Sequence, residues 1–388
     1  MSASREADEG TGPGASDRVS PAETSVVIVT EGHRPAGLAD ALAGLARLDR
    51  AAREILIVGP RGAREAARAV AAQTQLCLPK TVRHVQAEAG NISAARNAGI
   101  AGTTGQLVAF IDDDAVPEPG WLDALCAGFL APDIAAVGGF TKTPDGAWQW
   151  RAEGVDMLGR TVPLVAPGDA GTRPNPAPGT PPGVAPGLAA PADPNAVAVT
   201  SAAPHSTVPH STGPHITGPH STAPYVPTPP AGIVLRPVGT CSAYRRAALT
   251  AIGGFDERFR FYLDDADMAV RLARAGWRLA LSPQAVVRHG LAASPRRDRF
   301  GVPRDLTEIG ASQALFLARY AGAARDQGLR EFRTLWRMRL ARRMQRGTLA
   351  PDTAAALLRS LDEGFHRGLH RHTLPPAMGA GSGCGPAG

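Results

Sequence analysis

Long apolar runs, clustered cysteines and aromatic-rich basic segments are all missing from this chain of 388 residues. No stretch of about 18 consecutive apolar residues occurs, so the sequence predicts no membrane-spanning helix. The four cysteines are scattered without metal-ligand spacing, which favours a reduced, cytoplasmic chain. The net charge of +6 is compatible with an anionic substrate or membrane surface. Because no aromatic-rich basic motif accompanies this charge, nucleic acid is not indicated as a partner.

Strands and helices alternate along the first part of the chain. Residues 1–22 are polar, and we expect them to be disordered and to contain no signal peptide. Apolar runs then predict strands at 25–30, 54–58, 107–111 and 134–140, and a further short strand is predicted at 81–85. Helical spacing of apolar or alanine residues predicts helices from about Leu38, from about Gly62 to Gln73, from Ser93 and from Trp121. This alternation predicts an α/β domain with a mostly parallel, doubly wound sheet.

A segment rich in proline, residues 166–231, interrupts this pattern. It contains a five-residue repeat, PHSTV, PHSTG, PHITG and PHSTA, which begins at Pro204. Regular proline excludes helix and sheet interiors, so we interpret the segment as a disordered surface insertion. Its histidines could bind a metal, but gathering them from an extended chain carries a large entropy cost.

Folded sequence resumes at Gly232 and divides into two parts. Residues 232–300 predict helices at 247–252 and from Asp264, followed by strands at 279–281 and 285–287. Residues 301–374 are helical, and 375–388 form a disordered tail. Near Trp336, Leu329, Phe332 and Leu340 form an apolar stripe flanked by arginines. This helix either packs on the domain with its arginines in water, or lies on an anionic membrane.

Three consecutive carboxylates, Asp112, Asp113 and Asp114, follow the predicted strand at 107–111. Ligands of open α/β sheets bind at the carboxyl ends of the parallel strands. Adjacent carboxylates repel one another unless a cation compensates them, and oxygen ligands suit Mg²⁺ or Mn²⁺. The residues alone leave two interpretations open: a divalent-cation site, or a solvated acidic loop that caps the next helix.

Four segments together resemble the family 2 glycosyltransferases of the GT-A fold. They are SVVIVT from Ser25, GNISAARNAGI from Gly90, FIDDDAVPEPGWL from Phe110, and the stretch Gly253 to Gly290 with GGFDERF, YLDDADMAVRLARAGW and VVRHG. They cover roughly residues 24–165, the nucleotide-sugar-binding half, and 232–295, the acceptor half. The resemblance implies an inverting transferase that moves a sugar from a nucleotide-diphospho-sugar to a hydroxyl of a saccharide or lipid-linked acceptor.

The resemblance also assigns catalytic and metal-binding roles. Asp265, the second member of the acidic pair with Asp264, matches the general base that activates the acceptor hydroxyl, and Asp264 lies on the acceptor side. Asp112, Asp114 and His289 match the ligands of a divalent cation, Mn²⁺ or Mg²⁺, which offsets charge on the leaving diphosphate.

Further residues match the donor-binding part of the family. Asp112 also matches a ribose contact, and the middle residue, Asp113, is grouped with it. Thr30 and Glu31 end the first strand, where the nucleobase binds, and Arg96 matches a basic residue near the nucleotide. Structural alternatives exist for several of these residues: helix capping for Asp264 and Asp265, a strand-end position for His289, and an ion pair for Arg96.

Two departures from the family pattern keep other functions open. Family members commonly carry an acidic residue at the end of the second strand, where this chain has Ile57-Val58-Gly59-Pro60. This change favours a non-catalytic sugar-nucleotide-binding module in a polysaccharide assembly system. The insertion is the second departure. A nucleotidyltransferase would require a glycine-rich basic phosphate loop after the first strand, and GHRPAG at Gly32 is a weak match.

We expect a cytoplasmic protein, with peripheral contact to the inner membrane face through the helix around Trp336 as the alternative.

Overall fold

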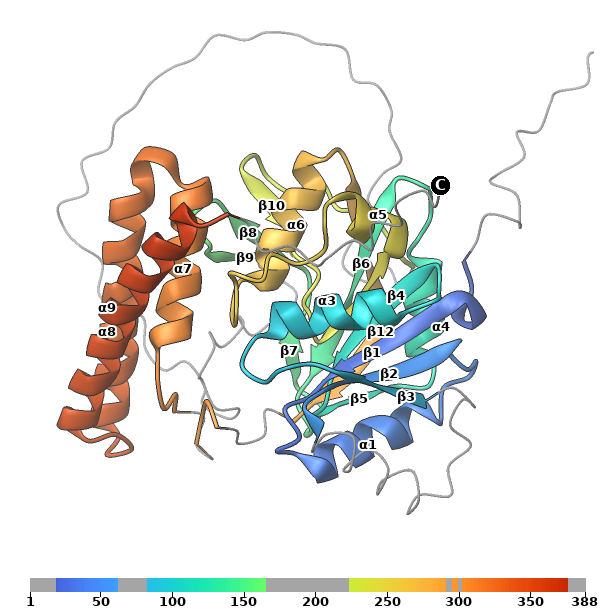
Figure 1. Ribbon diagram of the computed structural model, residues 1–388, viewed down its shortest axis with the longest axis horizontal. Coiled ribbons are helices and arrows are strands. Elements are labelled where there is room, and N and C mark those ends of the chain that lie inside the picture. Colours follow the sequence, from blue (N-terminus) through green and yellow to red (C-terminus); the bar gives the residue numbers. More distant parts are fainter. Residues whose placement is uncertain (1–18, 62–81, 165–222, 291–294, 299–301, 376–388) are drawn as a thin grey trace, which may run out of the picture.

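The computed structural model describes residues 19–61, 82–164, 223–290, 295–298 and 302–375 (Figure 1). The helix predicted from Gly62 to Gln73, the four repeat histidines and residues 376–388 of the predicted tail lie outside these residues. Within the described ranges, no helix is both long and apolar enough to cross a membrane.

A mixed sheet of nine strands forms the centre of the described structure. Its strands follow the order β3-β2-β1-β4-β11-β6-β12-β5, with β7 paired to β6. The strands are β1 (Thr24–Val29), β2 (Glu54–Gly59), β3 (Val82–Gln86), β4 (Leu107–Asp112), β5 (Ala115–Pro117), β6 (Ile134–Lys142), β7 (Trp148–Trp150), β11 (Cys241–Arg245) and β12 (Arg278–His289).

Most of these strands run in the same direction. β1, β2, β3 and β4 pair in parallel, and β6 pairs in parallel with β12. β11 lies between β4 and β6 and is antiparallel to both, so β6 points the same way as β4. β5 and β7 also run against their neighbours. The predicted strands of the first half and the mostly parallel sheet are therefore confirmed.

Helices cover both faces of this sheet. They are α1 (Pro35–Leu45), α3 (Ile92–Gly102), α4 (Trp121–Ala127), α5 (Arg246–Ala251) and α6 (Asp264–Arg274), and a 3₁₀ helix, η2 (Pro21–Glu23), precedes β1. α1 and α4 pack on one face against alternate residues of β1 and β4, such as Val26 and Ile111. α3, α5 and α6 pack on the other face, where Val27 and Phe110 point. This alternation is the two-residue period expected of a strand.

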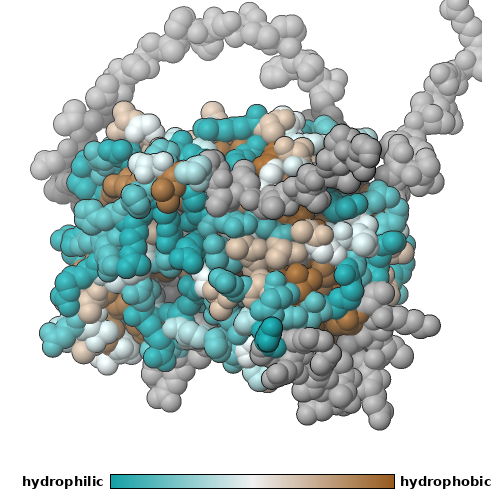
Figure 2. All heavy atoms as spheres, in the orientation of Figure 1, coloured by the Kyte–Doolittle hydropathy of each residue, from teal (hydrophilic) through white to brown (hydrophobic). Residues whose placement is uncertain are grey.

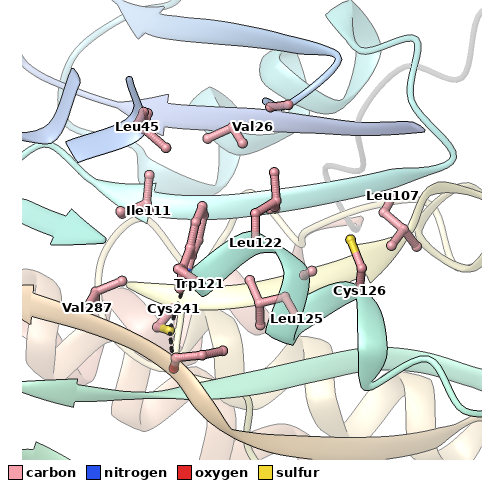
Figure 3. Close-up of a cluster of buried hydrophobic side chains, with 14 of the residues drawn as sticks. Val26, Leu45, Leu107, Ile111, Trp121, Leu122, Leu125, Cys126, Cys241 and Val287 are labelled. Carbon is pink, nitrogen blue, oxygen red and sulfur yellow. Dashed lines mark hydrogen bonds between the residues drawn. The ribbon is translucent and has the colours of Figure 1, made fainter. Parts of the chain in front are cut away.

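Trp121 anchors α4 to the sheet. Its side chain is fully buried among Ile111, Leu122 and Val287, and its indole Nε1 donates to Cys241 Sγ at 3.3 Å (Figure 3). Trp121 follows the acidic run by only a few residues. This contact therefore fixes the chain just beyond Asp114.

A second, three-stranded sheet follows in the order β10-β8-β9, with β8 (Glu153–Asp156), β9 (Thr161–Pro163) and β10 (Ile233–Leu235). Tyr225, which we placed at the end of the insertion, exchanges both backbone hydrogen bonds with Leu281 of β12, each 2.9 Å long. The insertion boundary itself stays a prediction. The two strands predicted at 279–281 and 285–287 were wrong as separate elements, because β12 continues through a register irregularity between Leu281 and Val286.

The C-terminal region is helical, with α7 (Thr307–Tyr320), η3 (Gly322–Ala324), α8 (Arg325–Gln345) and α9 (Pro351–Thr373) (Figure 1). Trp336 and Leu340 of α8 are buried with Ile309, Leu357 and Leu361 of α7 and α9. The apolar stripe therefore faces the other helices, as in the packed alternative. Hydrophilic residues predominate over these helices on the face shown in Figure 2.

Candidate active site

The three consecutive carboxylates lie at the carboxyl end of β4, as the sequence predicts. Asp112 is paired in register with Val29, so the ends of β1 and β4 meet at one edge of the sheet. The next strand in the sheet, β11, begins beside the same edge, with Cys241 opposite Ile111. Side chains from both halves of the chain therefore converge there.

Asp112, Asp114 and His289 form a cluster whose ligand atoms all lie within 4.8 Å of one another. His289 Nε2 is 3.3 Å from Asp114 Oδ1 and 3.8 Å from Asp112 Oδ2. Burial opposes ionisation of Asp114, but His289, Arg34 and Arg297 outweigh it and lower the pKa of this carboxyl. Two carboxylates and an imidazole are a donor set that suits Mn²⁺ or Mg²⁺. These residues therefore fit a divalent cation.

Asp113 points away from this cluster, toward the end of β1. Thr30 Oγ1 donates to Asp113 Oδ2 at 2.6 Å, and an Arg34 nitrogen lies 2.5 Å from Asp113 Oδ1. Arg34 also pairs with Asp114. Burial raises the pKa of Asp113 to about 6 despite these partners. Thr30 and Asp113 thus support the loop that carries Arg34, and Arg34 spans two of the three carboxylates.

Arg96 and Asp264 form an ion pair on the other side of β4. Both residues are buried, and the Arg96 guanidinium lies over the rings of Phe110 and Phe255, 5.6 and 5.2 Å from their centroids. Burial raises the pKa of Asp264 to about 6, although Arg96 opposes the shift. The structure thus places Arg96 in contact with Asp264 and ties α3 to the start of α6.

Asp265 lies at the N-terminus of α6, where the helix dipole favours a carboxylate. Gly239 N lies 3.4 Å from Asp265 Oδ2, and the next residue, Thr240, donates its hydroxyl to Asp112 Oδ2 at 2.6 Å. One dipeptide therefore contacts both acidic centres, the end of β4 and the start of α6.

The turn before Asp264 has an unusual backbone. Tyr262 and Leu263 have φ angles of 73° and 60°, and they are the described non-glycine residues with positive φ. Such left-handed conformations cost roughly 1–3 kcal/mol each and persist where surrounding contacts enforce them. Ser312 of α7 donates to Phe261 O at 2.7 Å, and the ring of Tyr262 stacks on Phe332 of α8. The C-terminal helices therefore contact the turn that presents Asp265.

Glu31 lies just beyond β1 and is half-buried. Its Oε1 accepts hydrogen bonds from Gly90 N at 3.1 Å and from Arg296 at 3.2 Å. β2 ends at Gly59, so this neighbouring strand brings no carboxylate to the edge. Of Thr30 and Glu31, the two residues predicted to meet the nucleobase, Glu31 is the one with a carboxylate.

Sequence comparison assigns the chain to a family. The family described as "Glycosyl transferase family 2" matches residues 25–166, and "Glycosyltransferase like family 2" matches residues 230–301. Together these matches take in more than half of the chain and every site residue described above. The chain belongs to glycosyltransferase family 2. Its fold is of the GT-A type.

Two curated relatives come from Mycobacterium tuberculosis. An N-acetylglucosaminyl-diphospho-decaprenol L-rhamnosyltransferase is 45% identical over 67 residues, which cover 16% of this chain and 22% of that protein. A pre-mycofactocin glycosyltransferase is 29% identical over 197 residues, 51% of this chain and 29% of that protein. The matched regions span less than a third of either relative.

Solved structures are similar at lower identity. A crystal structure of GalNAc-T7 with UDP, GalNAc and Mn²⁺ has 13% sequence identity and a TM-score of 0.48, covering 78% of this chain and 48% of that one. A crystal structure of S. aureus TarS residues 1–349 with UDP-GlcNAc has 14% identity and a TM-score of 0.44, covering 90% and 89%.

The sequence of this family 2 glycosyltransferase did not reveal every residue at the site. Gly239, Thr240 and Gln149, whose Oε1 lies 3.0 Å from His289 Nδ1, were missed because no local motif marks them. Arg34 lies in the GHRPAG segment, which we weighed only as a weak phosphate loop. The sequence feature that could have identified Arg34 is its position: it is a basic residue a few positions after the first strand. Arg297, 3.6 Å from Asp114, had no signal beyond its charge.

Proposed function

We propose that this chain is a metal-assisted, inverting glycosyltransferase. It transfers a sugar from a nucleotide-diphospho-sugar to the hydroxyl of a saccharide or lipid-linked acceptor. The observation that carries the proposal is the Gly239–Thr240 contact with both Asp265 and Asp112. It holds a candidate base and a candidate cation site at adjacent positions, as transfer between a donor and an acceptor requires.

Asp265 is the proposed general base. An acceptor hydroxyl is a weak nucleophile at neutral pH, and a carboxylate within hydrogen-bonding reach removes its proton as the sugar is attacked. Attack on the face opposite the leaving diphosphate inverts the anomeric carbon. Asp265 lies in the first turn of α6, and the buried Arg96–Asp264 pair holds that end of the helix in place.

Asp112, Asp114 and His289 are the proposed ligands of the divalent cation. When bound, the cation supplies positive charge that stabilises the departing nucleoside diphosphate. Arg34 and Arg297 add positive charge beside the same carboxylates, and Arg34 is held there by Asp113. Thr30 and Glu31, together with Asp112 and Asp113, form the proposed nucleoside side of the donor site.

The acceptor class follows from the relatives. The name of the rhamnosyltransferase relative describes a lipid-linked saccharide diphosphate as its acceptor. We therefore propose that a lipid-linked or saccharide acceptor binds on the Asp264–Asp265 side of the site, next to the turn at Tyr262. Peripheral contact with a membrane remains part of this proposal, because such an acceptor lies in one.

A donor screen tests the proposal. The thermal stability of the wild type and of Asp114→Ala is measured with UDP, GDP and other nucleoside diphosphates, with and without Mn²⁺. Stabilisation by one nucleotide that depends on Mn²⁺ and is lost in Asp114→Ala is the expected result. Asp265→Asn should then bind that nucleotide normally and fail to transfer sugar. Intact turnover by Asp265→Asn would remove Asp265 as the base.

A non-catalytic nucleotide-sugar-binding module is the second candidate, favoured by the lack of a carboxylate at the end of β2. The same variants separate the two functions. A donor that binds wild type and Asp265→Asn equally, with no nucleoside diphosphate released by either, supports the module. Release of pyrophosphate by the wild type, in place of a nucleoside diphosphate, would indicate nucleotidyl transfer.

A further inference from the structure

The two ring nitrogens of His289 face different partners. Nε2 faces the carboxylates, 3.3 Å from Asp114 Oδ1, whereas Nδ1 lies 3.0 Å from Gln149 Oε1. His289 is 4% exposed and Gln149 is 5% exposed, so water does not compete freely for either side chain. Among the described residues, Gln149 is the hydrogen-bond partner that the structure gives to Nδ1.

An amide oxygen can only accept a hydrogen bond, so the contact with Gln149 requires a proton on Nδ1. In a neutral imidazole that carries its proton on Nδ1, the lone pair is on Nε2. This is the nitrogen that faces Asp112 and Asp114. The hydrogen bond therefore selects the tautomer in which His289 can bind a cation at the carboxylate cluster.

We propose that Gln149 is a positioning residue for the cation site: it holds the proton on His289 Nδ1 and directs Nε2 toward a divalent cation shared with Asp112 and Asp114. This inference rests on the proposed function, because it assigns a role at the same site. Partners that orient a metal-binding histidine typically change metal affinity 10–100-fold when they are removed.

The fold fixes Gln149 from both sides. Trp150 N donates to Thr141 Oγ1 at 3.0 Å, which secures β7 to β6. The Trp150 ring lies against the His289 ring, with centroids 5.2 Å apart and planes at 34°. Trp148, on the other side, packs edge-on against Phe140. The short strand β7 thus supplies both the hydrogen bond to the imidazole and an aromatic surface against it.

Titration of the full chain with Mn²⁺ alone tests the inference without a sugar donor or acceptor. Mn²⁺ affinity is measured by isothermal calorimetry, and the signal of free Mn²⁺ is followed by electron paramagnetic resonance. Gln149→Leu keeps the bulk of the side chain without the acceptor oxygen, and it should bind Mn²⁺ roughly 10–100-fold more weakly. Gln149→Glu restores an acceptor oxygen and should bind within a few-fold of the wild type.

Thr141→Val is the matched control. It removes the hydroxyl that accepts from Trp150 N in the same hairpin, and among the described hydrogen bonds this hydroxyl has none to His289 or Gln149. This variant should melt at a lower temperature and bind Mn²⁺ like the wild type. A purely structural role of Gln149 would instead lower the melting temperature of Gln149→Leu and leave the affinity unchanged.

The outcomes separate this inference from the proposed function. If Asp114→Ala loses Mn²⁺ binding while Gln149→Leu binds like the wild type, the role of Gln149 is overturned and the cation site stands. If Gln149→Leu, Gln149→Glu and Thr141→Val weaken binding equally, loosening of the hairpin explains the loss, and the inference is also overturned. If the wild type binds no Mn²⁺, alone or with UDP or GDP, the cation site fails and the role of Gln149 fails with it.

Discussion

Arg96 and Asp264 form a buried ion pair although 168 residues separate them in the chain. Arg96 belongs to the half of the chain before the insertion, and Asp264 to the half after it. Two aromatic rings, Phe110 and Phe255, pack against the guanidinium. This pair is therefore a direct link between α3 and α6, the helix whose second residue is the proposed base.

Replacement of Arg96 by methionine should strongly destabilise the protein. The variant leaves Asp264 buried without its counter-charge, and breaking a buried ion pair costs about 3–5 kcal/mol. Urea unfolding of Arg96→Met measures the loss. The double variant with Asp264→Asn is the control, and it should lose less than the sum of the single variants because no unpaired charge is left. Additive losses would show that the two side chains act independently.

A second ionic cluster joins α6 to α7. Asp267 Oδ1 accepts from Tyr320 Oη at 2.6 Å and from Arg319 at 2.7 Å, and its Oδ2 accepts from Arg271 at 2.7 Å. Tyr320→Phe removes a single hydrogen bond to this buried carboxylate, and we expect a loss of about 1.5–3 kcal/mol in unfolding free energy.

The size of that loss depends on the charge of Asp267. In an Asp267→Asn background, Tyr320→Phe should cost clearly less, because a neutral amide is the weaker acceptor. Both pairs of variants are compared by urea unfolding at pH 7. An equal cost of Tyr320→Phe in both backgrounds would argue against the hydrogen bond as its source.

Glu54 should make stability depend on acid pH. Burial would raise the pKa of Glu54, but hydrogen bonds from Arg83, Thr104 and Ser25 outweigh it and lower the pKa from 4.5 to about 2. A pKa lowered in the folded state gives stability that is present above 4.5 and is lost as the pH falls through about 2. The wild type should thus melt a few degrees above Glu54→Gln at pH 7. This difference in melting temperature, the gap between the two proteins, should narrow as the pH falls from 4.5 to 2. A gap that does not change with pH would exclude this ionisation as its origin.

Gly364 permits the close crossing of α9 over α7. A Cβ at Gly364 would lie 2.2 Å from the backbone oxygen of Thr307, an atom that no side-chain rotation can move. Gly364→Ala should therefore destabilise the protein by about 1–3 kcal/mol, although alanine favours helix more than glycine does. Thr353→Ala, at an exposed position of the same helix, is the control and should be neutral or slightly stabilising. Thermal melts of both variants give the comparison.

Local sequence patterns predicted those strands and helices that can be recognised from a run of a few neighbouring residues. β1, β2, β4 and β6 are short, mainly apolar runs, and the carboxylates follow one of them directly. Two strands were predicted at 279–281 and 285–287, and the segment between them, Ser282-Pro283-Gln284, contains a proline, which is uncommon inside a sheet. Pairing with β6 carries the strand past this segment, at the position of the register irregularity.

The rest of the site depends on contacts between distant residues. Thr240 reaches Asp112 across 128 residues, Gln149 reaches His289 across 140, and Arg34 reaches Asp114 across 80. Each of these residues is of a common type in an unremarkable local setting, so periodicity could not identify it. The place of β11 in the sheet is likewise set by pairing with distant strands.

The position of β11 also governs the order in which this protein can assemble. β4 and β6 leave the ribosome well before residues 241–245, and each lacks its shared neighbour until those residues arrive. Both strands expose unpaired edges during that interval, which is the condition that favours association between nascent chains. The edge of the sheet that carries Asp112, Asp113 and Asp114 is therefore completed late in synthesis. A chain truncated before β11 should aggregate rather than retain a partial activity.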